Sequence, residues 1–422
     1  MSKVKVDFIA ASCTDDYDPN SMPVEQARRL IRQYLTPVHD EESLPIRTAL
    51  GRVLAADILS PCNVPNYDNS AMDGYAFNGD VIAGGNKLKL IGTAFAGKPY
   101  GGKVGSGECV RIMTGAVMPD ETDTVVPQEQ AQVEGENITF MAEPRRGQHR
   151  RFAGEDLKQG QVVLPRGHLI RPADLGLVAS LGVGEVNVYR RLRVAFFSTG
   201  DELSNVGQTL ETGQVYDSNR YTIYGMLMRL GVEVIDMGVV RDDPVLLEQA
   251  LITASKSADV VMTSGGVSVG EADFMKLLLE KLGQVVFWKI AMKPGRPLAY
   301  GKVGNAHYFG LPGNPVSVMV TFYQFVREAL LLLMGNSHPQ PVPTLSAVCV
   351  DDIKKAPGRT EFQRGVLSQH ADGAWKVRLT GNQGSGILSS MSEANCFVVL
   401  AEDCANVPAG TMVQVQIMDG LV

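Results

Sequence analysis

The sequence predicts a multidomain protein in which an α/β domain with a parallel sheet accompanies an inserted β domain and a C-terminal β-barrel domain. The chain has 422 residues, and roughly 150 residues per domain would give about three domains. Short apolar runs alternate with helical segments over residues 191–338, as in a parallel sheet covered by helices on both faces. Residues 64–156 contain short β-rich runs divided by Gly and Pro turns, and residues 339–422 contain runs in which apolar and polar residues alternate with a period of two. The second of these regions fits a small barrel, with a sandwich as the alternative.

The composition indicates an ordinary globular protein of a reducing compartment. Hydrophobic residues make up 45% and charged residues 20% of the chain, which favours neither disorder nor a membrane protein. The formal net charge of -7 disfavours nucleic acid as a partner. The six cysteines form no C-x-x-C pair, and the N-terminus lacks the apolar core of a signal peptide. The apolar stretch 316–334 contains Arg327 and Glu328, so we expect a soluble cytoplasmic protein with no membrane span.

The N-terminal half is predicted to contain one domain inserted into another. Residues 1–20 are acidic and without periodicity, and we expect a loose tail there. A helix follows, for which Ser21 is a candidate cap. Residues 21–63 and 157–190 are expected to form a mixed α/β linker domain, which the inserted β domain, residues 64–156, interrupts.

The α/β domain is predicted from strands and helices in alternation. Apolar runs at 194–197, 232–235 and 260–263 are expected to be buried strands, and a helix at 219–230 should end at Gly231. In open sheets of this kind, ligands bind beyond the carboxyl ends of the strands. The loops that follow these strands are therefore the first place to look for a site.

The strongest local signal is a glycine-rich loop that directly follows a predicted strand and precedes a helix. Its chemistry-bearing residues are Ser264, Gly265, Gly266, Ser268 and Gly270. Glycines there let backbone N–H groups approach an anion closely, and the helix N-terminus adds a favourable dipole. An ordinary tight turn is the alternative, but it needs only one glycine. We therefore predict that this loop binds a phosphate-bearing ligand.

Two further segments of the same domain could contribute to an anion site. The turn Pro312, Gly313, Asn314, Pro315 places a plausible cap and a first-turn proline at the start of a long helix. Good capping alone would explain this turn equally well. Two lysines, Lys289 and Lys293, follow a predicted strand and could neutralise a phosphate or an oxyanion, with solvated surface lysines as the alternative.

Carboxylates recur in Gly- and Ser-rich loops, which suggests Mg²⁺ beside a phosphate. They are Asp73, Asp201, Glu202, Asp242, Asp243 and Asp273. Mg²⁺ prefers hard oxygen ligands, usually one or two carboxylates together with substrate phosphate. A turn or cap role is equally plausible for any single one of them. The basic run 145–151 could clamp an anion or form a charged hairpin face.

Ten segments, in the same order along the chain, resemble the MoeA family of molybdopterin molybdenumtransferases, to which the E domains of gephyrin and of plant Cnx proteins are related. The segments are DNSAMDGYAF, RIMTGA, AGEDL, FSTGDEL, YDSN, RDDP, TSGGVSVGEADF, KPGRPLAYG, GLPGNPVS and FQRG. The resemblance extends from about residue 22 to the C-terminus.

The resemblance implies an elongated homodimer with four domains in each subunit. The implied reaction converts adenylylated molybdopterin and molybdate into molybdenum cofactor, with release of AMP, in the presence of Mg²⁺. The implied cleft is shared, because the inserted domain of one subunit faces the α/β domain of the other. The resemblance also suggests contacts with the pterin adenylyltransferase and with apo-molybdoenzymes as protein partners.

The resemblance assigns site residues to three regions of the chain. On the inserted-domain side they are Asp73, Thr114, Arg151 and Asp156. On the α/β side they are Glu202, Asp242, Asp273, Lys289, Lys293, Pro312 and Pro315. The C-terminal domain is expected to contribute Arg364 and Ser385.

A mechanism consistent with both lines of reasoning relies on charge stabilisation, because phosphoryl chemistry needs positioning more than covalent help. The glycine loop and the helix after Asn314 are expected to hold the terminal phosphate of the pterin. Mg²⁺ on Asp242 or Asp273 would polarise the anhydride, and the lysines would gather molybdate. Asp73 and Glu202 are expected to position ligands or to relay protons.

Two other functions compete with this interpretation. One is the pterin adenylyltransferase, whose related domain usually carries a Thr-Gly-Gly-Thr-Gly loop, whereas this chain has Ser-Gly-Gly-Val-Ser and three further domains. The other is a non-catalytic pterin carrier or scaffold, which would bind the pterin tightly without turnover.

Overall fold

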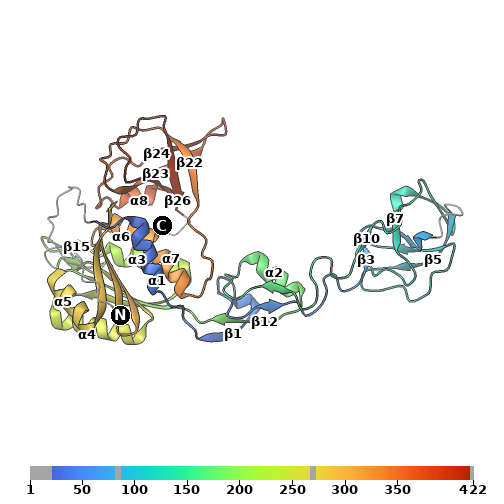
Figure 1. Cartoon of the computed structure of the whole chain (residues 1–422), viewed down its shortest axis with the longest axis horizontal. Coiled ribbons are helices and arrows are strands. Elements are labelled where there is room, and N and C mark those ends of the chain that lie inside the picture. Colours follow the sequence, from blue (N-terminus) through green and yellow to red (C-terminus); the bar gives the residue numbers. More distant parts are fainter. Residues whose placement is uncertain (1–20, 81–86, 267–271, 419–422) are drawn as a thin grey trace.

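The structure of the chain, a computed structural model, describes residues 21–80, 87–266 and 272–418. In Figure 1 the chain is elongated, with the inserted β domain at one end and the linker domain in the middle. The α/β domain and the C-terminal barrel lie together at the other end. The multidomain α/β-plus-β architecture predicted from the sequence is therefore confirmed.

The α/β domain is built on a six-stranded sheet of order β16-β13-β17-β21-β20-β18. Its strands are β13 (Arg193–Thr199), β16 (Glu233–Val240), β17 (Val260–Ser264), β18 (Gly283–Lys289), β20 (Pro297–Val303) and β21 (Ala306–Leu311). The first four in spatial order are parallel, which confirms the parallel sheet. β20 is antiparallel to both β21 and β18. The sheet is therefore mixed at this edge, where a short turn joins β20 to β21.

Helices cover both faces of this sheet and bury it. They are α3 (Ser218–Leu230), α4 (Pro244–Ser257), α5 (Ala272–Leu282), α6 (Pro315–Thr321), the π-helix η4 (Phe322–Val326) and α7 (Arg327–Leu333). Along β13, Val194 and Phe196 pack into one core, while Ala195 and Phe197 pack into the other. Successive side chains of a strand point to opposite faces, so this strand is apolar throughout.

The predicted helix at 219–230 is confirmed as α3, and the physical signals at its two ends are those expected. Asp217 accepts a hydrogen bond from the backbone N–H of Arg220 and caps the first turn. Gly231 ends the helix with a φ of 75°, in the left-handed region that favours glycine.

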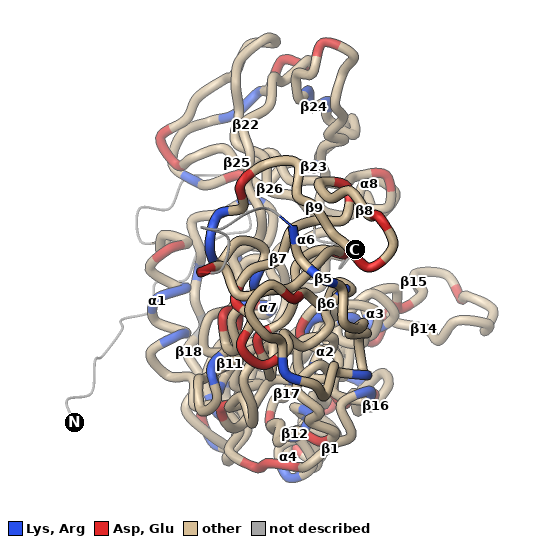
Figure 2. The backbone as a smooth tube through the Cα atoms, turned by 90° about the vertical axis from the view of Figure 1, so that its right-hand side faces the viewer, with Lys and Arg blue, Asp and Glu red and all other residues tan. Residues whose placement is uncertain are grey.

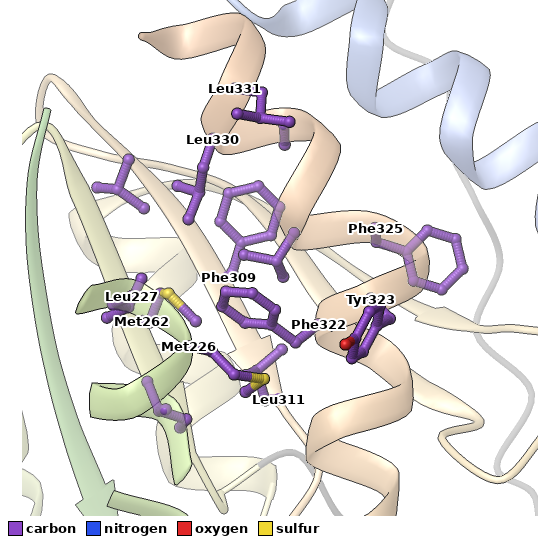
Figure 3. Close-up of a cluster of buried hydrophobic side chains, with 14 of the residues drawn as sticks. Met226, Leu227, Met262, Phe309, Leu311, Phe322, Tyr323, Phe325, Leu330 and Leu331 are labelled. Carbon is purple, nitrogen blue, oxygen red and sulfur yellow. The ribbon is translucent and has the colours of Figure 1, made fainter. Parts of the chain in front are cut away.

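The long apolar segment Pro315–Leu333 is a core helix. It is long and apolar enough to cross a membrane, but 83% of its apolar window is buried inside the protein. Figure 3 shows Phe322 and Leu330 of this segment beside Phe309 and Met226, which come from the sheet and from α3. Burial on nearly all sides explains why its sequence is apolar around its whole circumference.

The first helix, α1 (Val24–Tyr34), packs on the α/β domain although it belongs by position to residues 21–63. Val24, Ala27 and Ile31 join the same core as Phe322. Ser21 does not cap this helix, because Pro23 occupies the N-cap position and no side chain caps it. The Ser21 hydroxyl instead accepts a hydrogen bond from Arg296 at 3.4 Å.

The linker domain consists of two short antiparallel strand pairs, one α-helix and a short 3-10 helix, Ile46–Thr48, around a small core. The pairs are β1 (Glu41–Pro45) with β12 (Glu185–Tyr189) and β2 (Ile58–Leu59) with β11 (Val162–Leu164), and the helix is α2 (Pro172–Ser180). Arg190, just after β12, donates to both carboxylate oxygens of Asp259 at 2.7 Å and also pairs with Asp40. This clamp joins the linker domain to the start of β17.

The inserted domain contains a six-stranded sheet of order β7-β4-β6-β5-β9-β8. Its strands are β4 (Gly74–Phe77), β5 (Lys87–Ala94), β6 (Glu108–Ile112), β7 (Thr124–Pro127), β8 (Ala131–Glu134) and β9 (Asn137–Phe140). A short pair, β3 (Asn69–Ser70) and β10 (Arg150–Arg151), lies beside it in the same domain. Figure 2, in which this domain faces the viewer, shows acidic and basic segments interspersed rather than separated.

The C-terminal domain is a closed five-stranded barrel, which confirms that prediction. Its strands are β22 (Thr344–Cys349), β23 (Thr360–Gln369), β24 (Trp375–Leu379), β25 (Cys396–Leu400) and β26 (Met412–Ile417), with the short helix α8 (Ser389–Glu393). Pairing of β23 with β25 closes the circuit, and closure leaves no free edge among these strands. The short strand β19 (Met292–Lys293) of the α/β domain pairs with β23.

Candidate functional site

The candidate binding loops of the α/β domain lie together at one edge of its sheet. Ser264 of β17 is in register with Ser198 of β13 and with Leu311 of β21. Thr199 of β13 is in register with Val240 of β16. The carboxyl ends of four parallel strands therefore meet, and this edge is where ligands bind in open α/β sheets.

The first two glycines of the glycine-rich loop have backbone conformations that favour glycine, and the first also lies close to a neighbouring backbone. Gly265 and Gly266 have φ values of +92° and +66°, which side chains rarely allow. A Cβ atom on Gly265 would lie 2.4 Å from the backbone oxygen of Thr199. The N–H of Gly265 donates to the oxygen of Leu311 at 3.2 Å, so it is already used within the protein. Ser268 and Gly270 lie outside the described residues.

Asn219 joins two of the loops at this edge. Its side-chain Nδ2 donates to the hydroxyl of Ser264 at 2.9 Å and to the backbone oxygen of Gly313 at 2.6 Å. The Ser264 hydroxyl in turn donates to the oxygen of Pro312 at 3.3 Å. Sequence reasoning did not assign Asn219 to the site, although it lies in the segment YDSN, because a single amide at a helix start carries no signal of its own.

Carboxylates gather at the same edge, beyond β13 and β16. Asp242 accepts a hydrogen bond from the Thr199 hydroxyl, and its N–H lies 3.4 Å from a carboxylate oxygen of Asp201. Glu202 folds back over Gly200, where an added Cβ would lie 2.5 Å from its Oε2. By contrast, Asp243 caps α4 by accepting from two backbone N–H groups, so its role is structural.

The oxygen ligands at this edge fit a hard cation. The Asp242 carboxylate lies beside the Thr199 hydroxyl and the Asp201 carboxylate beside the Asp242 backbone, and Mg²⁺ commonly binds through one or two carboxylates with water and phosphate. Within the described residues, no three His, Cys, Asp or Glu side chains form a metal cluster. The side chain of Asp273, the other predicted metal ligand, is outside the description.

The start of α6 is covered by the C-terminal domain. Pro315 has no N–H, and the N–H of Val316 donates to the backbone oxygen of Ser385 at 3.1 Å. Asn314 occupies the N-cap position, but its side chain makes no capping hydrogen bond. The two first positions of this helix therefore have no N–H left for an anion.

Arg364 lies behind the loop that contains Ser385. Its fully buried guanidinium donates to the backbone oxygens of residues 382–384 and to the hydroxyl of Ser390. Burial lowers the pKa of Arg364 to about 10, which still leaves it protonated at neutral pH. The structure thus places Arg364 as a support for residues 382–385, which reach the start of α6.

The two predicted lysines lie at the barrel side of this edge. β18 and β21 both run antiparallel to β20, so Lys289 ends β18 at the same edge at which β21 ends. Two strand spacings place β18 roughly 10 Å from β21. Lys293 is exposed on β19, which pairs with β23 of the barrel.

In the inserted domain, two predicted residues contact each other directly. The Oδ1 atom of Asp73 accepts from the backbone N–H of Thr114 at 2.7 Å and from its hydroxyl at 2.6 Å. The Thr114 hydroxyl and N–H lower the pKa of Asp73, and the positive charge of Arg111 acts in the same direction. The adjacent strands β4 and β6 place these residues together, since Gly74 is in register with Ile112. An ionised carboxylate is thereby presented at the surface.

The basic run of the inserted domain is largely neutralised by carboxylates. Arg150 pairs with Asp68, and Arg151 donates to Glu155 at 2.5 Å. Arg146 contacts two further aspartates. This pairing favours the charged-face interpretation over an anion clamp. Asp156 is exposed in the same region.

One chain does not bring these two groups of residues together. Figure 1 places the inserted domain, with β3, β5 and β7, and the helices α4 and α5 of the α/β domain at opposite ends of the elongated molecule. The linker domain, with β1, β12 and α2, lies between them.

Comparisons with known proteins place the whole chain in one family. Three family models match it in order: the MoeA N-terminal region (domain I and II) at 22–182, a probable molybdopterin binding domain at 195–331, and the MoeA C-terminal region (domain IV) at 346–418. The chain is 46% identical to a molybdopterin molybdenumtransferase of Haemophilus influenzae, covering 94% of this chain and 98% of that protein. A molybdopterin molybdenumtransferase of a Nostoc species is 34% identical over 86% of this chain and 85% of its own length.

A solved structure supports the same assignment. A molybdopterin biosynthesis MoeA protein from Pyrococcus horikoshii matches with a TM-score of 0.82 and 29% identity, covering 94% of this chain and all of that chain. Identity over nearly the whole length, together with the order of the domains, shows that the chain belongs to the MoeA family of molybdopterin molybdenumtransferases.

Proposed function

We propose that this chain inserts molybdate into adenylylated molybdopterin, with release of AMP, to give molybdenum cofactor. The observation that carries the proposal is the 46% identity to a molybdopterin molybdenumtransferase across 94% of the chain. The sheet edge supports it, because the glycine turn, the carboxylates of Asp201 and Asp242 and the end of the strand that carries Lys289 all lie at the edge where α/β sheets bind ligands.

The charged residues at this edge have different roles in the proposed reaction. Ser264 and the glycine turn after it would lie beside the phosphate of the pterin. Asp201 and Asp242 would hold Mg²⁺ together with Asp273. Bound Mg²⁺ supplies neutralisation of the negative charge on the phosphoanhydride. Lys289 and Lys293 attract the molybdate dianion, which is a substrate. Rate enhancement then comes from positioning and charge stabilisation rather than from a covalent nucleophile.

The site is completed by a second copy of the chain. Asp73 and Thr114 present an ionised carboxylate far from the α/β edge of their own chain. α3, beside that edge, carries exposed Tyr221, Tyr224 and Met228 at helical spacing. An apolar stripe of this kind is suited to association with another protein surface. A homodimer in which the inserted domain of one copy faces the α/β edge of the other accounts for both features.

The proposed reaction also implies protein partners and a cellular location. Its substrate is an adenylylated pterin, so contact with a pterin adenylyltransferase is part of the proposal, as is delivery of the product to apo-molybdoenzymes. A cytoplasmic location follows from such partners and from cysteines that are free within the described residues.

The test of this function uses purified protein, adenylylated molybdopterin, molybdate and Mg²⁺. We expect molybdate-dependent AMP release and activation of an apo-molybdoenzyme by the product. Tight binding of the pterin without AMP release would contradict the proposal and support a carrier.

A further inference from the structure

We propose that Asn219 is a positioning residue that sets the spacing of the phosphate-binding wall of the site. This inference rests on the proposed function. Asn219 comes from α3, whereas Ser264 ends β17 and Gly313 follows β21. Its single amide group bonds to both loops, at 2.9 Å and 2.6 Å. It is therefore the side chain through which α3 fixes the two loops relative to each other.

The orientation of this amide follows from its partners. The backbone oxygen of Gly313 can only accept, so the nitrogen of the Asn219 amide must face it. The Ser264 hydroxyl already donates to Pro312, so it accepts from the same nitrogen. Both N–H groups of the amide are thus committed to the loops.

The remaining atom of the amide is left without a partner. The Oδ1 atom of Asn219 is buried and accepts no hydrogen bond from the described residues. Buried polar atoms of native proteins usually have a hydrogen-bond partner. The partners that the structure gives this amide are those of its nitrogen, and these tie it to the two loops.

The backbone that carries Asn219 is itself fixed. Asp217, which is 2% exposed, caps α3 two residues earlier through the N–H of Arg220. On the other side, Ile223, Met226 and Leu227 bury α3 in the core beneath the sheet. The amide is therefore held from a rigid element, as a group that positions a site requires.

The chemistry predicts which measured constant should change. Ser264 and the glycine turn approach the pterin phosphate, and neither loop supplies a leaving group or a proton. Losing the tether should weaken binding of the pterin substrate, while the chemical step in the bound complex and the affinity for molybdate should change little.

The experiment compares Asn219→Asp and Asn219→Ala with the wild type. Asn219→Asp keeps the shape but replaces the N–H donors by an acceptor beside the Gly313 oxygen. Thr222→Ala is the matched control, because it removes one hydrogen bond within α3, from the Thr222 hydroxyl to the Ser218 oxygen. Binding of adenylylated molybdopterin is measured by calorimetry, AMP release gives kcat and KM, and thermal unfolding reports stability.

We expect the Kd and KM for adenylylated molybdopterin to rise about tenfold or more in both Asn219 variants, with kcat and the KM for molybdate within about threefold of wild type. Unchanged binding in both variants would overturn the inference, as would a loss of kcat with unchanged KM. If the wild type binds the compound without releasing AMP, the proposed function fails, but the binding comparison still decides the role of Asn219. If the wild type does not bind it, both fail.

Discussion

Oδ1 of Asp73 accepts two hydrogen bonds from one residue, Thr114, through its backbone N–H and its hydroxyl. Both bonds favour the ionised carboxylate, and the carboxylate is exposed rather than buried. An acid group that is held charged at the surface, at the far end of the molecule from the α/β edge, suits a site completed by another copy of the chain.

Removing the Thr114 hydroxyl should raise the pKa of Asp73. The folded-state pKa is lowered, so the ionised form is present at neutral pH and is lost only as pH falls through that lowered value. In Thr114→Val the acid limb of the pH profile of AMP release should therefore move to higher pH. Thr139→Val, in the same domain, is the control. Coincident profiles for Thr114→Val and wild type would show that the hydroxyl does not tune this carboxylate.

Gly265→Ala should destabilise the α/β domain more than a positive φ alone explains. The added Cβ would meet the Thr199 oxygen at 2.4 Å, in addition to the unfavourable φ of +92°. We expect a loss of about 2–4 kcal/mol in the free energy of unfolding.

Gly373→Ala is the matched control for this change. Gly373 has a φ of +81° but no atom within 4 Å of an added Cβ, so it should cost only about 1 kcal/mol. Urea denaturation measures both variants. Equal losses would show that the contact with Thr199 relaxes easily.

Asp259→Asn should loosen the junction between the linker and α/β domains. Burial alone would raise the pKa of Asp259, but hydrogen bonds from Arg190 and from the Arg193 N–H outweigh it and lower the pKa. The stabilisation is therefore present above the unfolded pKa of about 3.9 and is lost as pH falls through the folded value.

For this variant we expect a loss of about 2 kcal/mol at pH 7, since hydrogen bonds to charged groups are worth roughly that much. The difference from wild type should shrink toward pH 3. Thermal unfolding across this pH range measures it. A difference that does not depend on pH would contradict the assignment of the stabilisation to the charged pair.

Arg364→Met should destabilise the barrel and residues 382–385. The substitution leaves the backbone oxygens of residues 382–384 without their donor in a part-buried place, which costs about 1–3 kcal/mol. Arg378→Met is the control, because Arg378 forms an exposed ion pair with Glu393 in the same domain, worth about 0–1 kcal/mol. Similar unfolding midpoints for the two variants would show that Arg364 does not support the loop.

Local sequence patterns predicted the elements of the fold well where the signal itself is local. α3 was predictable because it follows a predicted strand and ends at Gly231, and the parallel strands because each is a short apolar run. The sequence did not predict that β20 runs antiparallel to its neighbours β18 and β21. The direction of a strand depends on which strands it pairs with, and a local sequence pattern does not show that pairing. Ser21 does not cap α1, because the helix begins at Val24 and Pro23 occupies the N-cap position.

The candidate site was predictable as a set of loops but not as a set of contacts. The resemblance named Asp73 and Thr114, yet their mutual hydrogen bonds depend on the register of β4 with β6. Asn219 gave no signal, because its partners are 45 and 94 residues away along the chain. Arg364 was expected to bind substrate, whereas burial places it behind the loop.

The measurement that tests the account most directly mixes two inactive variants, Asp73→Ala and Asp242→Ala, and assays AMP release. If each site combines Asp73 of one copy with Asp242 of the other, half of the randomly formed dimers carry one intact site. Activity should then recover to about a quarter of wild type, while either variant alone stays inactive. If the mixture remains inactive although the copies exchange, the site lies within one chain and the account is contradicted.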